Sequence, residues 1–84
     1  MNLSSDDLQT LEQLRDVLSQ RKVRRQEIKD QIESYRKALA SSGLDFEKAM
    51  MYRDQMDQEK DRLEKANLSI LEIEEKISEI ENRA

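Results

Sequence analysis

Apolar residues recur every three or four positions in two long segments of this chain, with a break in the pattern between them. In the first segment these positions are Leu11, Leu14, Leu18, Ile28, Ile32, Tyr35 and Leu39. In the second they are Ala49, Tyr52, Met56, Leu63, Ala66, Ile70, Ile73, Ile77, Ile80 and Ala84. This spacing is the heptad pattern of a coiled coil, in which one narrow apolar stripe faces a neighbouring helix. It predicts two helices, over about residues 4–41 and 45–83.

The break between the two segments has the sequence features of a tight turn. Gly43 is the only glycine, and the chain has no proline. Because glycine adopts a left-handed backbone without a Cβ clash, we predict Gly43 at the C′ position after the first helix and Leu44 at C″. Asp45 is a suitable N-cap for the second helix. With a turn at about residues 42–44, the two helices form an antiparallel two-helix coiled-coil hairpin. The predicted fold is therefore all-α, and the hairpin forms a single domain.

The start of the first helix carries a capping sequence. Ser4, with Asp7 three residues later, resembles a capping box. Leu3 and Leu8 stand at the two positions of a hydrophobic staple, which fixes the direction in which the chain enters a helix. We therefore expect Ser4 to be the N-cap.

Two charged residues within the stripes suggest how the helices align. Folding the chain about residue 42 makes the numbers of facing positions sum to 84, which places Arg25 opposite Glu59. We predict that these two residues form a polar pair inside the seam, where their mutual neutralisation disfavours slipped registers. The alternative is that both long side chains reach solvent along the edge of the seam.

Composition excludes several classes of protein. The 84 residues are 40% charged and 4% aromatic, so a conventional globular core is not expected. The chain has no His and no Cys, and its serines have no activating partner, so we predict no catalytic residues, no metal site and no cofactor. No apolar run reaches membrane-spanning length, and no signal peptide follows Met1, so a soluble, cytoplasmic protein is expected.

Some large apolar residues lie outside the predicted stripes. On the second helix Phe46 and Met50 lie near the turn, and Leu68 and Leu71 lie toward the open end; Val17 and Val23 are the corresponding residues of the first helix. A two-helix rod has one seam and is marginally stable alone. We therefore expect Phe46, Met50, Leu68 and Leu71 to bind a protein partner, most simply a second copy, in a four-helix bundle.

Charge is concentrated in one stretch. Residues 21–37 carry seven basic and three acidic side chains, although the whole chain has a net charge of −4. A solvated helix face with salt bridges inside the rod is the simpler interpretation. The alternative is a stripe that contacts phosphates, but no aromatic residue precedes Tyr35 in this stretch to stack on a base. Nucleic-acid binding is therefore not our first expectation.

The residues around the turn, LDFEKAMMYRDQM at positions 44–56, resemble the UVR motif. That motif is a short helical hairpin of UvrC and of the C-terminus of UvrB, and reads as an apolar residue followed by acidic-Phe-Glu-x-Ala-Ala-x-Leu-Arg-Asp-x-Ile. The matching residues are Leu44, Phe46, Glu47, Ala49, Arg53, Asp54 and Met56, whereas Met50 and Tyr52 depart from the pattern. The resemblance covers about residues 28–63 and implies docking of one hairpin on another in a four-helix bundle.

The function expected from these features is protein–protein interaction, as an adaptor, scaffold or assembly factor that is not an enzyme. A small chaperone or stalk protein of the type used in secretion systems is an alternative, because such proteins are similar charged hairpins. A regulatory hairpin that contacts nucleic acid through residues 21–37 is another. The chain is also compatible with a segment of a larger machine. No membrane association is expected.

Overall fold

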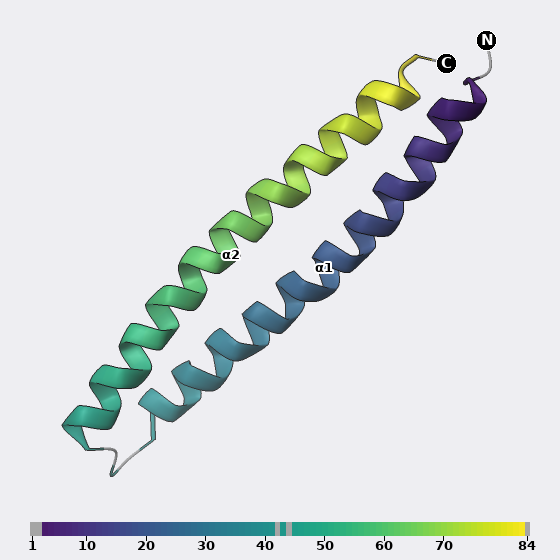
Figure 1. The fold of residues 1–84 in the computed structure, drawn as a ribbon. Helices are drawn as coiled ribbons and strands as arrows, with labels where there is room; N and C mark the ends of the chain where they lie inside the picture. The colour runs from purple at the N-terminus through teal and green to yellow at the C-terminus, as the bar shows by residue number, and fades with distance from the viewer. Residues whose placement is uncertain (1–2, 42, 44, 84) are drawn as a thin grey trace.

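The computed structural model describes residues 3–41, 43 and 45–83, which form two long α-helices and no strand. α1 (Ser5–Leu39) and α2 (Phe46–Glu81) lie side by side and antiparallel, so that the beginning of α1 and the end of α2 lie at the same end of the molecule (Figure 1). The resulting rod measures 64 by 14 by 13 Å. The predicted all-α hairpin is confirmed.

Both predicted N-caps are present. The Ser4 hydroxyl oxygen accepts a hydrogen bond from the backbone N–H of Asp7 at 3.0 Å, and the Asp45 carboxylate accepts one from the N–H of Lys48 at 2.8 Å. Each bond satisfies an amide of the first turn that has no partner inside the helix. Leu3 packs against a cluster formed by Leu11, Ile77 and Ile80, so the chain before the cap is also held.

The connection between the helices is longer than predicted. α1 ends at Leu39, with Ala40 as its C-cap, and the N–H of Ala40 bonds to the carbonyls of Arg36 and Ala38. Gly43 has the predicted left-handed backbone, with φ +87°, but it lies three residues beyond the cap instead of at C′. The C′ assignment is therefore wrong, because the last turn closes on Ala40. The predicted role of Leu44 lies outside the described residues.

Gly43→Val is expected to lower the free energy of unfolding by about 1–2 kcal/mol, because a β-branched residue is strained in the left-handed region. A Cβ added at Gly43 has no atom within 4 Å, so the backbone conformation is the only source of this loss. Thermal unfolding followed by circular dichroism measures the effect. Gly43→Asn is the control, since Asn tolerates this conformation and should retain most of the stability. Equal melting temperatures for Val and Gly would contradict the prediction.

The seam between the helices follows the predicted stripes. Every described member of the two apolar stripes is buried or half-buried, and so are Arg25 and Glu59. Among the described residues, the buried side chains are Leu11, Ile28, Ile70, Ile77 and Ile80. Arg21 also occupies a stripe position, but it is exposed to solvent. The heptad pattern therefore identified which side of each helix faces the other.

The register differs from the predicted one by a heptad. Tyr35 packs against Tyr52 with ring centroids 5.9 Å apart and the rings tilted by 34°, and Arg83 donates a hydrogen bond to Asp7 at 3.1 Å. Leu11 packs with Ile77 and Ile80, whereas the predicted register placed it opposite Ile73. The numbers of these contacting residues sum to between 87 and 91, and three of the four pairs lie closer to 91, the next register that keeps the stripes facing each other, than to 84. The heptad stripe looks the same after a shift of seven residues, so the pattern alone did not fix the alignment.

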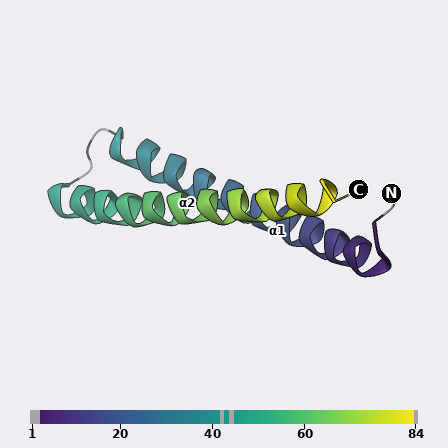
Figure 2. The same cartoon turned by 90° about the horizontal axis from the view of Figure 1, so that it is seen from above.

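This shift leaves α2 projecting beyond the end of α1 at the loop. Figure 2 shows the first turns of α2 extending past the last turn of α1, while α1 extends past α2 at the opposite end. The longer connection spans the offset between the two helix ends. As a result, the residues at the start of α2 have no helix opposite them.

Candidate protein-interaction surface

The projecting start of α2 carries the most exposed large apolar side chain of the described residues. Phe46 is 77% exposed, and Met50, one turn later, is 49% exposed. Met51 extends this loop-end patch around the helix and is 48% exposed. The sequence predicted Phe46 and Met50 as exposed residues but missed Met51. The heptad pattern already contained this signal, because Met51 lies between the stripe residues Ala49 and Tyr52 and faces away from the seam in any register.

A second apolar pair lies on α2 toward the open end of the hairpin. Leu68 and Leu71 are 56% and 53% exposed, and a spacing of three residues places them on one face of the helix. Ile70 is 2% exposed, which shows that the seam lies on a different side from this open-end pair. Both leucines therefore lie outside the seam, and their predicted role in binding a partner stays a prediction.

Carboxylates separate the two apolar groups along the outer face of α2. Between Met50 and Leu68, steps of three and four residues lead through exposed acidic side chains, namely Asp54, Asp57, Asp61 and Glu64. Residues at these steps share one helix face. The outer face of α2 is thus apolar at both ends and negatively charged in the middle. A partner that covers it has to accommodate this charge.

The predicted pair of Arg25 and Glu59 is not formed. Arg25 donates a hydrogen bond to the side-chain carbonyl of Asn67 at 3.2 Å. Glu59 instead accepts from Arg62 of its own helix at 2.7 Å, and its side chain is only 13% exposed. The shifted register is the physical reason, since it moves Glu59 away from the level of Arg25. The prediction of a polar pair across the seam is wrong.

A cationic groove, which we define by Arg21, Arg24, Arg62 and Lys65, runs between the helices midway along the rod. The groove has a volume of about 370 Å³, and its other lining residues are Ile28, Ala66 and Ser69. Arg24 pairs with Glu27 at 3.1 Å, and Arg62 pairs with Glu59. The basic stretch 21–37 supplied only one side of this groove. The contribution of α2 followed from the register and was not predicted.

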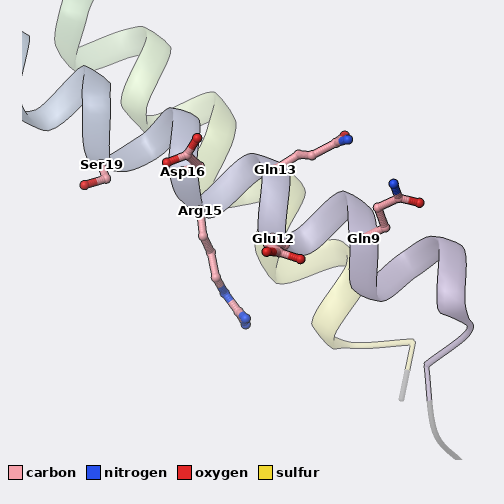
Figure 3. A pocket seen from close by; sticks show the side chains of 6 residues that line it. All are labelled: Gln9, Glu12, Gln13, Arg15, Asp16 and Ser19. Carbon is pink, nitrogen blue, oxygen red and sulfur yellow. The ribbon is translucent and has the colours of Figure 1, made fainter.

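A shallow hollow lies on the surface of α1. Figure 3 shows its side chains spreading outward from a single helix; they are Gln9, Glu12, Gln13, Arg15, Asp16 and Ser19. All six are exposed. The Arg15 guanidinium lies 3.9 Å from the Glu81 carboxylate of α2. With no second wall, the hollow leaves all six side chains open to water.

Within residues 3–41, 43 and 45–83, no group of three metal-ligating side chains comes together. Over the same residues, neither helix has an apolar stretch long enough to cross a membrane. No protein-family model matches the chain, and no similar chain is found among the curated proteins or the solved structures. The UVR-like pattern around the loop therefore stays a prediction from the sequence.

Proposed function

We propose that this hairpin is a protein-interaction module without enzymatic activity, and that it pairs through the outer face of α2 with another helical hairpin to form a four-helix bundle. The proposal rests on the exposure of four large apolar side chains along one helix of a rod that is only two helices thick; they are Phe46, Met50, Leu68 and Leu71. Burying such side chains is the main source of association energy for helical bundles. A second copy of the chain is the proposed partner.

The thinness of the seam supports this proposal. Only five side chains among the described residues are buried. A hairpin with so small a core gains stability when it associates, because the partner removes further apolar surface from water. The sequence resemblance to the UVR motif agrees with this mode of action by analogy, since those hairpins dock on other hairpins.

Self-association is expected at concentrations on the order of tens of micromolar, which corresponds to a free energy of roughly 6–7 kcal/mol. We also expect it to strengthen as salt rises from low to moderate ionic strength. The apolar contacts are insensitive to salt, whereas salt screens the repulsion between the carboxylate stripes around Asp57 and Asp61. Sedimentation equilibrium at several salt concentrations measures both effects.

Two double variants test which surface is used. Phe46→Ser with Met50→Ser removes most of the loop-end patch, and Leu68→Ser with Leu71→Ser removes the open-end pair. Each should weaken the dimer at least tenfold, because two half-exposed apolar side chains are lost from the interface. Val23→Ser is the matched control, since Val23 is 59% exposed on α1. A wild-type chain that stays monomeric under these conditions would refute the proposed homodimer.

A further inference from the structure

The cationic groove has the features of a binding site for another helix. It lies between two antiparallel helices, where the ridges of a third helix pack in helical bundles. Ala66 and Ser69 are small and half-buried at its α2 side, and the buried Ile28 lies at its α1 side. Small side chains keep the floor of the groove low, so that a helix with a diameter of about 10 Å can approach both walls.

The charges along the groove determine which kind of helix it can bind. Each helix contributes two cations spaced by three residues, Arg21 and Arg24 from α1 and Arg62 and Lys65 from α2. Among the residues that the structure describes, Arg21 and Lys65 form no ion pair, whereas Arg24 and Arg62 each bind a carboxylate of their own helix. The groove therefore keeps a local excess of positive charge in a chain whose net charge is −4.

We infer that the cationic groove binds an acidic amphipathic helix of a partner protein, with apolar side chains of that helix over Ala66 and Ser69 and its carboxylates on Arg21 and Lys65. Apolar contacts on the floor provide affinity, and the charged walls fix orientation and exclude basic helices. This surface shares no residue with the loop-end patch or the open-end pair, so it adds a second partner to the proposed self-association.

Nucleic acid fits the groove less well than a helix does. No aromatic residue lines the groove, so there is no platform on which a base can stack. Asp61 and Glu64 precede Arg62 and Lys65 and are exposed on the outer side of the same wall. A duplex is wider than the groove, and its flanking phosphates would lie over these carboxylates and be repelled. An acidic helix is narrower than a duplex, so its carboxylates can lie between the two walls of the groove and away from these outer carboxylates.

The test uses the full chain and a synthetic helix of about 21 residues, which is six turns, with Leu and Ala along one edge and Glu on both flanks. Fluorescence polarisation should show binding that is about tenfold tighter than that of the same peptide with Gln in place of Glu. Amide chemical shifts in the NMR spectrum should change mainly within residues 21–28 and 62–69. Binding should weaken as salt rises.

The decisive variant is Arg21→Gln with Lys65→Gln, which should lower the affinity for the Glu peptide about tenfold. Lys22→Gln with Lys29→Gln is the matched control, because it removes the same charge from heptad positions on the other side of the seam. Leu68→Ser with Leu71→Ser should retain peptide binding, which separates this inference from the proposed dimer.

Four results would overturn the inference. The first is that the Glu peptide does not bind at hundreds of micromolar; a dissociation constant in this range corresponds to a binding free energy on the order of 4–5 kcal/mol. The second is an equal loss of affinity in the Lys22 and Lys29 control. The third is tighter binding of an oligonucleotide with the same dependence on Arg21 and Lys65. The fourth is a dimer that dissociates in the Arg21 and Lys65 variant, which would identify a second copy as the occupant.

Discussion

Ile70→Ala is expected to lower the free energy of unfolding by about 2–4 kcal/mol, and the melting temperature by on the order of 10 °C or more. Ile70 is 2% exposed and is the most completely enclosed large side chain among the described residues. Its truncation removes apolar contacts and leaves a space that two long helices cannot readily close. With so few buried side chains, the hairpin has little other packing to compensate.

Leu71→Ala is the matched control for this prediction. Leu71 adjoins Ile70 in the sequence but is 53% exposed, so its truncation should change the free energy of unfolding by no more than about 0.5 kcal/mol. Unfolding is best followed by circular dichroism at low micromolar concentration, where self-association contributes little. Equal effects of the two substitutions would show that Ile70 does not face α1.

Arg25→Leu combined with Glu59→Leu is expected to raise the free energy of unfolding by about 2 kcal/mol, and the melting temperature by on the order of 10 °C. Both residues occupy stripe positions and are half-buried, so a leucine at either place extends the apolar seam. Removing Glu59 leaves Arg62 with a side chain that is 58% exposed, and water then solvates its charge. Neither substitution leaves a buried unpaired charge.

A double-mutant cycle separates this expectation from that of a polar pair across the seam. Because Arg25 contacts Asn67 and Glu59 contacts Arg62, the two single substitutions should be additive to within about 0.5 kcal/mol. A polar pair would instead make Arg25→Leu alone destabilising and give a clear coupling energy. Such a coupling would contradict the register described here.

Local features of this hairpin were determined by the sequence. Capping depends on residues three positions apart, so Ser4 and Asp45 identified the helix starts without any tertiary information. The side of each helix that faces the seam followed from the heptad spacing, because burial of a stripe requires only that a second stripe lie opposite. The left-handed conformation of Gly43 was likewise predicted, since glycine is the residue that adopts it at least cost.

The alignment of the two helices was decided only by the tertiary structure. A heptad repeat is unchanged by a shift of seven residues, so packing of individual layers, such as Tyr35 on Tyr52 and Leu11 on Ile77, has to select one register. That selection leaves Phe46 without an opposing helix. It also brings Arg62 and Lys65 to the same groove as Arg21 and Arg24, although about 40 residues separate the two pairs in the sequence. The absence of a helix opposite Phe46 and the two-sided cationic groove therefore depend on long-range alignment, which local periodicity does not encode, whereas the outer face of α2 followed from the heptad pattern.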